Sequence, residues 1–414
     1  MKLPVTVIGL VIMSVALAAA QIAGWRARPE AVANAAQQQP GFNYEESRVE
    51  PYTLPDPLAS KGARVTNAKA WRARRAEILD LFRTNVYGRS PVPSDPVTFS
   101  TLEENAAAMD GAATLRRIAV VSTLGARAHR FELTLFLPNK VTGPVPVFLL
   151  INNRPRSNTD PTRKEKSDFW PAERLIARGC GIAAFHYAEL APDDPKTYRD
   201  GVIAFFDQGS GGKAPYTWGA LAAWAWGASR AMDYFETDSR IDRRHVAVVG
   251  HSRGGKAALW AGAEDERFAM VVSNDSGEGG AALSRRNFGE TIERINTAFP
   301  HWFTETYKTF NQHADKLPVD QHMLLALAAP RALYVASADE DLWADPRGEF
   351  LSLAATSPVF ALWGDAPLSA SNMPPVDKPL ISGRRGYHVR TGGHNLTPYD
   401  WDRYVDFAER LWKK

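Results

Sequence analysis

The sequence predicts an α/β fold in which a mostly parallel sheet is covered by helices on both faces. Apolar, strand-like runs alternate with longer helical segments between about residues 145 and 412, a pattern typical of parallel strands joined by helical crossovers. One apolar run, at 246–250, ends in a Gly-x-Ser-x-Gly turn that leads into an alanine-rich segment. Such a turn between a strand and a helix is typical of a nucleophile elbow. Together these observations indicate the α/β-hydrolase fold.

The individual elements follow from local patterns of apolar residues and turn signals. Two neighbouring runs near the start of the domain alternate as antiparallel strands do, and the later runs are continuous enough to be buried strands. The expected strands cover 115–121, 129–137, 145–152, 182–186, 246–250, 270–274 and 332–336. The expected helices cover 71–87, 218–235 and 398–412, of which we expect the second to be amphipathic.

The N-terminal residues predict a targeting segment ahead of a single domain. Lys2 precedes an apolar run over 3–20 that ends in three alanines, which favours a cleaved secretory signal over an uncleaved membrane anchor. We interpret 21–55 as a linker because it lacks hydrophobic periodicity, and 56–414 as one catalytic domain. The enzyme is therefore expected to be secreted or periplasmic, without stable membrane association once the signal is removed. The only cysteine, Cys180, has no partner for an intramolecular disulfide.

Composition excludes several classes of function. The 49 basic residues nearly balance 46 acidic ones, leaving a net charge of +3 without a basic block, so the chain has no electrostatic footprint for nucleic acid. Dispersed histidines and the absence of an H-E-x-x-H pattern or a phosphate-binding loop predict neither a metal nor a cofactor. At 414 residues and 45% hydrophobic content the chain can bury a large core. We expect a monomer that needs only water as co-reactant.

The elbow makes Ser252 the candidate nucleophile. Its alternative reading is a glycine-rich turn with a surface serine, which we disfavour because both the strand and the helix are present. A serine nucleophile needs a histidine base, and in this fold the chain order is serine, acid, histidine. His394 lies in a glycine-containing loop just before the last helix and is our candidate. His388 is its nearest competitor, but it lies in a strand-like stretch.

Two aspartates are candidates for the acid that orients the histidine. Asp275 follows the strand expected at 270–274, and Asp341 follows the strand expected at 332–336. The acid of this fold usually follows the later strand, which favours Asp341. The residue types alone leave both open, because the other aspartate can cap a loop or a helix.

Several motifs resemble glucuronoyl esterases, carbohydrate esterase family 15, over roughly residues 70–412. The elbow at 250–256 resembles the family's G-x-S-R-x-G-K pattern, and 85–89 resembles its N-V-Y-G-R segment. Further matches are S-G-x-G-G at 276–280, R-x-x-F-G-E at 286–290, and the segments 299–303, 343–346 and 393–394. Several motifs in order are more specific than any one of them. The family consists of α/β-hydrolases that cleave esters of 4-O-methyl-glucuronic acid in xylan.

The resemblance implies a role for each matched residue. Besides Ser252 and His394, it implies Arg253 as a stabiliser of the oxyanion. It also implies three substrate-binding residues, Lys256 and Glu290 for the sugar hydroxyls and Trp343 for the wall of the uronate pocket. The family usually places a glutamate where this chain has Asp275, while some bacterial members use the following strand. On that ground we place Asp275 narrowly ahead of Asp341.

The expected substrate is a glucuronoxylan or lignin–carbohydrate ester. Two cations beside the serine suit a polar sugar better than a lipid, since an arginine after the nucleophile can stabilise developing negative charge. The alternative within this chemistry is another secreted serine carboxylesterase, such as an acetyl-xylan or feruloyl esterase, or a peptidase. A catalytically silent binding module for hemicellulose is disfavoured because both Ser252 and His394 are present.

Overall fold

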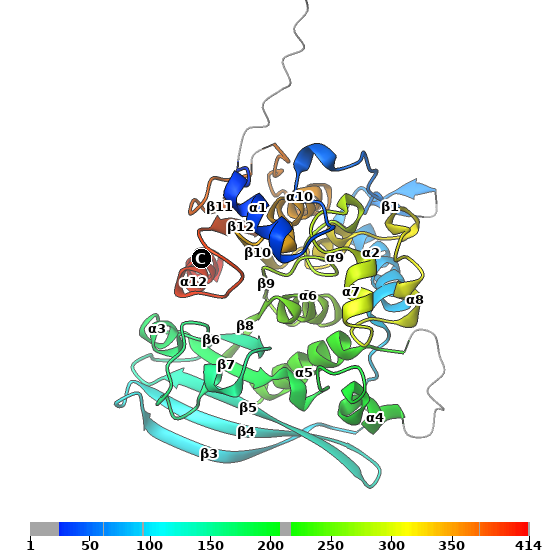
Figure 1. Ribbon diagram of the computed structural model, residues 1–414. Coiled ribbons are helices and arrows are strands. Elements are labelled where there is room, and N and C mark those ends of the chain that lie inside the picture. Colours follow the sequence, from blue (N-terminus) through cyan, green and yellow to red (C-terminus); the bar gives the residue numbers. More distant parts are fainter. Residues whose placement is uncertain (1–24, 61, 93–94, 208–216, 372, 413–414) are drawn as a thin grey trace, which may run out of the picture.

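The computed structural model describes residues 25–60, 62–92, 95–207, 217–371 and 373–412. These residues build a ten-stranded sheet with helices on both faces (Figure 1). In sheet order the strands are β11 Leu380–Ser382, β12 Arg385–Arg390, β10 Ala332–Ala338, β9 Met270–Asn274, β8 Ile241–His251, β6 Val145–Asn152, β7 Gly181–His186, β5 Arg127–Pro138, β4 Ala113–Leu124 and β3 Thr98–Ala108. The six strands from β12 to β7 are mutually parallel, and the outer ones pair antiparallel. The α/β-hydrolase fold predicted from the sequence is confirmed.

The helices divide between the two faces of the sheet. In chain order they are α1 Pro29–Gln38, α2 Ala68–Phe82, α3 Ala172–Ala177, α4 Val202–Asp207, α5 Ala220–Phe235, α6 Arg253–Glu264, α7 Ile292–Ala298, α8 Glu305–Lys308, α9 Gln321–Ala326, α10 Pro346–Ala355, α11 Ser357–Phe360 and α12 Pro398–Trp412. The two short strands β1 Ala59–Ser60 and β2 Ala63–Arg64 form a separate hairpin. Helices α3 and α12 bury their apolar residues against one face, whereas α2, α5, α6 and α9 share the larger core on the other.

Short helical turns connect these elements. The 3₁₀ turns are η1 Glu46–Arg48, η3 Arg156–Thr159, η4 Tyr187–Glu189, η5 Tyr198–Asp200, η6 Ser284–Arg286, η7 Ala314–Lys316, η8 Leu342–Ala344 and η9 Ala361–Trp363, and η2 Arg83–Tyr87 is a π-helical turn. Four of them, η3, η4, η6 and η8, lie in the segments that follow the parallel strands β6, β7, β9 and β10, at the carboxyl ends where ligands of open α/β sheets bind.

The element bounds expected from the sequence agree closely with the structure for the interior strands and less well for the edge of the sheet. The expected strand at 145–152 and the helix at 398–412 match β6 and α12, because buried strands and amphipathic helices carry strong patterns. Strand β3 was not predicted, since its mostly exposed, polar residues lack alternation. Helix α5 was expected to be amphipathic, but it is buried nearly all round, with only Ser229, Arg230 and Asp233 partly exposed.

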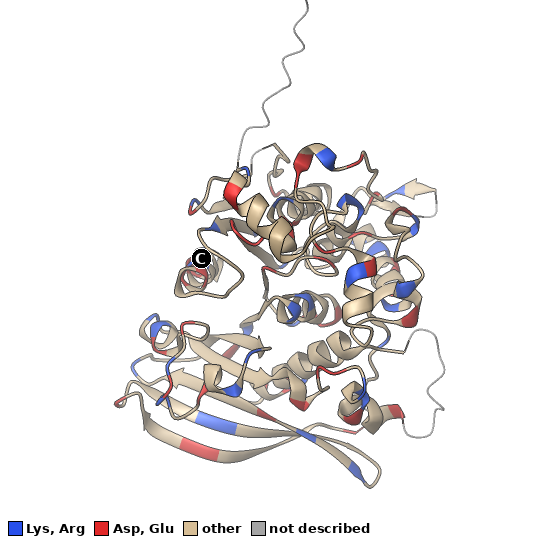
Figure 2. Cartoon of the chain, viewed as in Figure 1, with Lys and Arg blue, Asp and Glu red and all other residues tan. Residues whose placement is uncertain are grey.

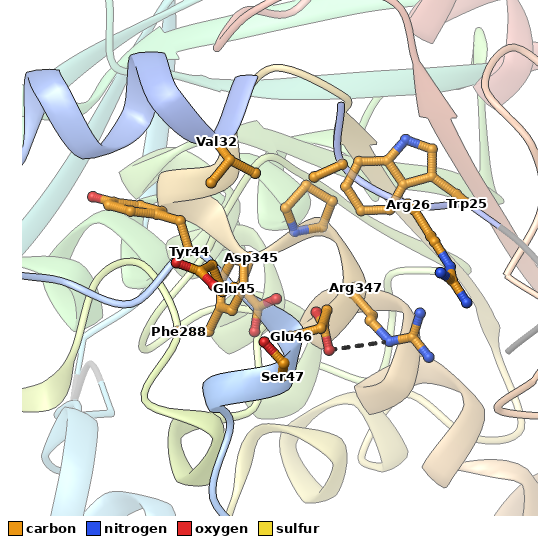
Figure 3. Close-up of a pocket in the computed structure, with 12 residues that line it drawn as sticks. Trp25, Arg26, Val32, Tyr44, Glu45, Glu46, Ser47, Phe288, Asp345 and Arg347 are labelled. Atoms are coloured by element: carbon orange, nitrogen blue, oxygen red, sulfur yellow. Dashed lines mark ion pairs between the residues drawn. The ribbon is translucent and has the colours of Figure 1, made fainter. Parts of the chain in front are cut away.

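The interpretation of 21–55 as a linker is wrong for residues 25–55, which pack onto the domain. Trp25 and Tyr44 are buried, with 8% and 4% of their surface exposed, and Glu46 forms an ion pair with buried Arg286. The segment also lines an open pocket of about 460 Å³ together with Phe288 and the start of α10 (Figure 3). The sequence did not predict this packing, because isolated side chains make the contacts and leave no hydrophobic periodicity. The expected signal at 1–20, and 21–24, lie outside the described residues.

Charged residues of both signs are interspersed over the described chain (Figure 2). Many of them pair, as Arg117 does with Glu103 and Glu132. Among the described residues, no helix has the length and apolarity needed to cross a bilayer.

Candidate active site

Ser252 occupies a strained turn between β8 and α6. Its backbone has φ 56° and ψ −126°, a conformation that is costly for a residue with a side chain. The Ser252 N–H donates to the carbonyl of Asn274 at 2.8 Å, which ties the turn to β9. A Cβ atom at Gly250 would lie 1.9 Å from the carbonyl oxygen of Gly254, so the strand and the helix approach too closely for a side chain. The strand–turn–helix expected at this position is present.

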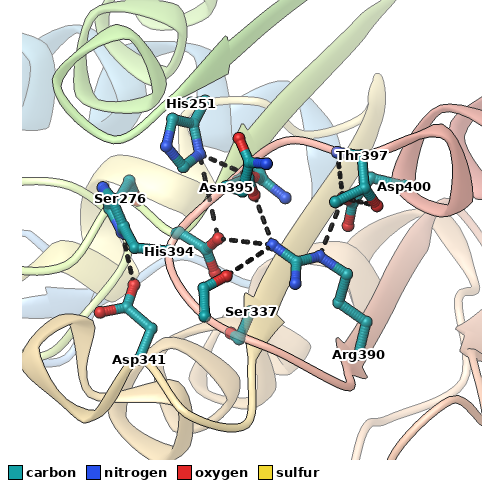
Figure 4. A network of polar contacts seen from close by, with 12 residues as sticks. His251, Ser276, Ser337, Asp341, Arg390, His394, Asn395, Thr397 and Asp400 are labelled. Atoms are coloured by element: carbon teal, nitrogen blue, oxygen red, sulfur yellow. Dashed lines mark hydrogen bonds and ion pairs between the residues drawn. The ribbon is translucent and has the colours of Figure 1, made fainter. Parts of the chain in front are cut away.

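His394 lies beside the elbow in the loop after β12. Its ring centroid is 4.4 Å from that of His251, the residue before Ser252. Its Nδ1 atom is 2.6 Å from Oδ2 of Asp341 (Figure 4). A carboxylate that accepts the Nδ1–H bond leaves Nε2 free to take a proton. The competitor His388 is fully buried, with Nε2 2.8 Å from Asp400.

Backbone hydrogen bonds hold the loops of His394 and Asp341 together. The Asp339 N–H donates to the carbonyl of Arg390 at 2.9 Å, and the Glu340 N–H donates to the carbonyl of Gly392 at 3.1 Å. The Gly392 N–H donates in return to the Asp339 carboxylate at 2.8 Å. These bonds extend the parallel pairing of β10 and β12 past the ends of the strands, so the acid and the histidine keep a fixed separation.

Asp275 lies close to this pair but contacts a different cation. Its Oδ2 atom is 3.3 Å from Nη2 of Arg390, which also pairs with Asp400. Burial and the charge of Asp341 raise the pKa of Asp275, and Arg390 opposes them only in part. No hydrogen bond joins Asp275 to His394 among the described contacts. The order expected from the sequence is therefore reversed: Asp341 is the carboxylate that contacts the histidine.

Asp275, Asp341 and His394 also form a group of three potential metal ligands whose donor atoms lie within 4.8 Å of one another. Two of the three are hydrogen-bonded to each other, and the third contacts the guanidinium of Arg390. A cation next to Asp275 disfavours a second cation at the same oxygen atoms. The donor set therefore fits acid–base chemistry better than metal binding.

Arg253 is held at the elbow by a carboxylate and two aromatic rings. Its Nη1 donates to Oδ2 of Asp193. The guanidinium carbon lies 4.8 Å from the ring centroid of Trp302 and 5.3 Å from that of Phe299. Because Arg253 directly follows Ser252 and is 30% exposed, it can place positive charge beside the oxygen on which negative charge develops.

The expected substrate-binding residues meet at one place. Lys256, one helical turn beyond Ser252 on α6, has its Nζ 3.8 Å from Oε2 of Glu290 and also donates to the carbonyl of Ser276. Burial lowers the pKa of Lys256 and raises that of Glu290, and their opposite charges counteract both shifts. The Glu290 N–H donates to the carbonyl of Trp343 at 3.1 Å. A buried charge pair suits a sugar with several hydroxyl groups, whereas Trp343 contacts Glu290 only through its backbone carbonyl and packs its ring edge-to-face with Phe42.

Comparison with known proteins places this geometry in a family. A family model described as "Glucuronyl esterase, fungi" matches residues 120–364. The chain is 41% identical to the carbohydrate esterase MZ0003 from an unknown prokaryotic organism, over 93% of this chain and 94% of the relative. The chain belongs to the glucuronoyl esterase family.

A solved structure and a fungal sequence support the same family assignment. The solved structure of the glucuronoyl esterase from Solibacter usitatus superposes with a TM-score of 0.83 at 40% identity, covering 89% of this chain and 100% of that one. The 4-O-methyl-glucuronoyl methylesterase of Schizophyllum commune is 29% identical over 75% of this chain and 74% of its own. The resemblance to carbohydrate esterase family 15 inferred from the motifs is therefore confirmed.

Two residues at the site of this glucuronoyl esterase escaped the sequence analysis. Arg154, in the loop after β6, is half-buried, and its Nη2 is 3.2 Å from Nε2 of His251. Its place directly after a buried strand is a signal that could have identified it. Asp193, the partner of Arg253, lies in an irregular loop between η4 and η5. Nothing in its local sequence distinguishes it from the neighbouring Asp194.

Proposed function

We propose that this protein hydrolyses esters of 4-O-methyl-glucuronic acid, such as those that link glucuronoxylan to lignin alcohols, through an acyl-enzyme on Ser252. The observation that carries the proposal is the combination of two arrangements at one elbow. The hydrogen-bonded pair of His394 and Asp341 can activate a serine, and the pair of Lys256 and Glu290 can bind an acyl group that is itself a sugar. Relatives named as 4-O-methyl-glucuronoyl methylesterases support this substrate class.

The reaction begins with proton transfer from Ser252 to Nε2 of His394 as the serine oxygen attacks the ester carbonyl. The Asp341 carboxylate stabilises the imidazolium that forms. Negative charge gathers on the carbonyl oxygen, where Arg253 supplies positive charge. Collapse of the tetrahedral intermediate breaks the bond to the alcohol, which leaves with the proton from His394. Water then repeats the sequence on the acyl-enzyme and releases glucuronate.

Specificity is expected to come from the acyl side of the substrate. The ammonium of Lys256 and the carboxylate of Glu290, which pair at the elbow, favour a ligand that donates to Glu290 and accepts from Lys256, as a sugar hydroxyl does in both directions. An acetyl group has no hydroxyl, and the single phenolic hydroxyl of a feruloyl group lies at the end of the group away from the ester. The same pair therefore supports a glucuronoyl esterase over an acetyl-xylan or feruloyl esterase.

We also propose that residues 1–20 are a cleaved secretory signal and that the mature protein is a secreted or periplasmic monomer. The basic start, the apolar run and the alanines at 18–20 support the signal. Expression of the full chain with N-terminal sequencing of the mature protein tests the cleavage. Sedimentation of the purified protein tests the oligomeric state, and a dimer would contradict the proposal.

The substrate assignment is tested by comparing a benzyl ester of glucuronic acid with 4-nitrophenyl acetate. We expect rapid turnover of the uronate ester, weak turnover of the acetate, and loss of both in Ser252→Ala. Comparable efficiency on the two substrates, or activity on the acetate alone, would overturn the glucuronate assignment and favour a general esterase. Turnover by Ser252→Ala would overturn the nucleophile.

A further inference from the structure

Asp193 is the centre of a cluster of polar contacts at the edge of the site. Its Oδ1 atom accepts hydrogen bonds from Nε2 of His301 at 2.8 Å and from Nε1 of Trp302 at 2.7 Å. Its Oδ2 atom contacts Nη1 of Arg253 and lies 3.3 Å from the hydroxyl of Tyr187. Four donors from three parts of the chain thus converge on one carboxylate whose side chain is only 7% exposed.

Asp193 carries a negative charge throughout the working range of an esterase. Burial by itself raises the pKa of this carboxyl, but the hydrogen bond from His301, the charge of Arg253 and the bond from Trp302 outweigh it and lower the pKa to about 2. A permanently charged, nearly buried carboxylate is costly unless it is fully paired. Here the paired cation is Arg253, the residue that directly follows the nucleophile.

The rings of Phe299 and Trp302 also hold the guanidinium of Arg253 in place. Phe299 and Trp302 stack on each other with their ring centroids 3.8 Å apart, and the guanidinium of Arg253 lies within 5.3 Å of both rings. Trp302 therefore contacts Arg253 with its ring and Asp193 with its Nε1–H. An arginine held by a carboxylate and an aromatic ring loses much of its rotamer freedom before substrate arrives.

We propose that Asp193 is a positioning residue that fixes the guanidinium of Arg253 for stabilisation of the oxyanion. Among the described residues, Asp193 is the one carboxylate that contacts Arg253. A guanidinium has five N–H donors, so anchoring through Nη1 leaves others for the substrate oxygen. Catalysis gains when such donors are fixed in advance, because they need no reorganisation in the transition state. This inference rests on the proposed function, in which Arg253 stabilises the oxyanion.

The inference also gives a role to the aromatic segment 299–303, whose sequence matches the family. Its His301 and Trp302 orient the carboxylate of Asp193, and its Phe299 supports the guanidinium through Trp302. Asp193 does not touch the reacting atoms, so its effect must pass through Arg253. That dependence separates a positioning role from a merely structural one.

The test is a double-mutant cycle between Asp193→Ala and Arg253→Ala, measured as kcat and KM on the benzyl ester of glucuronic acid. We expect Arg253→Ala to lower kcat roughly a hundredfold or more and Asp193→Ala to lower it roughly tenfold to thirtyfold, with KM nearly unchanged. In the Arg253→Ala background, Asp193→Ala should change kcat less than about twofold, because the residue it positions is gone.

The control is Asp194→Ala, which removes the neighbouring exposed carboxylate from the same loop. Asp194 bonds only within its own turn, to the backbone of Lys196 and Thr197 and the Thr197 hydroxyl. We expect near wild-type kcat from this variant, and Asp193→Glu should recover part of the activity that Asp193→Ala loses. Thermal unfolding of each variant shows whether it is folded.

Three results would overturn the inference. The first is that Asp193→Ala lowers kcat by the same factor in the wild type and in the Arg253→Ala variant. The second is that Asp194→Ala lowers kcat as much as Asp193→Ala does. The third is that Asp193→Ala keeps the kcat of the wild type. An unchanged kcat in Arg253→Ala alone would instead contradict the proposed role of Arg253. Failure of the inference and failure of the proposed function are therefore distinguishable.

Discussion

Replacement of Asp341 by asparagine separates the two candidate acids. In Asp341→Asn the side chain keeps its size, and its amide oxygen can still accept a hydrogen bond from His394. What is lost is the negative charge 2.6 Å from Nδ1, which stabilises the imidazolium in the transition state. The expected consequence is a fall in kcat with little change in KM, because the substrate is bound before the imidazolium forms.

The size of the effect follows from the exposure of the pair. Two opposite charges about 4 Å apart attract by about 4 kcal/mol at the effective dielectric constant typical of a protein surface. The His394 side chain is 38% exposed, so partial screening by solvent reduces this attraction to about 3 kcal/mol. Since about 1.4 kcal/mol corresponds to a factor of ten in rate, kcat should fall roughly a hundredfold.

Asp275→Asn is the matched comparison, because the same chemical change is made on the neighbouring strand. The amide oxygen at 275 can still accept from Arg390, and loss of the charge relieves the repulsion from Asp341 that raises the pKa of Asp275. We expect kcat within about threefold of wild type. Both variants are assayed on the benzyl ester of glucuronic acid, with thermal unfolding as a check of the fold. A larger loss in Asp275→Asn than in Asp341→Asn would refute the reasoning.

Three further predictions concern substrate binding, pH dependence and the N-terminal segment. Lys256→Met should lower kcat/KM for the glucuronate ester roughly 10- to 100-fold, because it removes a hydrogen bond from a charged group. Hydrolysis of 4-nitrophenyl acetate should be unchanged. Equal losses on both substrates would contradict the contact between Lys256 and the sugar. The pKa of Asp193 is lowered to about 2, so its charge stabilises the fold above pH 4. The excess unfolding free energy of wild type over Asp193→Asn, about 2 kcal/mol at neutral pH, should be mostly lost as the pH falls from 4 to 2. A difference that grows on acidification would contradict this sign. Deletion of residues 1–50 should lower the unfolding midpoint in a thermal scan, because burial of Trp25 and Tyr44 contributes about 2 kcal/mol each, and an unchanged midpoint would contradict packing of the segment on the domain.

The sequence predicts the centre of this fold well because central strands are buried on both sides. Strands such as β9, whose five residues are all buried, read as continuous apolar runs with turns at each end. The elbow is also predictable from local sequence, because the close approach of the consecutive elements β8 and α6 requires glycine at its turn. Edge strand β3 carries no such pattern because it is mostly exposed and is held by backbone pairing with β4. The segment 25–55 carries none because isolated side chains make its contacts.

The acid shows the limit of local reasoning at the site. Asp275 and Asp341 end adjacent parallel strands, so both are near His394 from topology alone. What decides between them is Arg390, which contacts Asp275 from β12, and the bonding of the Asp341 loop to that of His394. Both are long-range contacts that local periodicity does not encode. Asp193 escaped for the same reason, since three of its four partners, Arg253, His301 and Trp302, are distant in the sequence.

The central claim, a glucuronoyl-enzyme on Ser252, is tested most directly by product partitioning. Several glucuronate esters with different leaving alcohols are hydrolysed in the presence of a fixed concentration of added ethanol. If all pass through one acyl-enzyme, the ratio of ethyl ester to free acid is the same for every leaving alcohol, and Ser252→Ala forms neither product. A ratio that varies with the leaving alcohol, or either product from Ser252→Ala, would contradict the covalent mechanism.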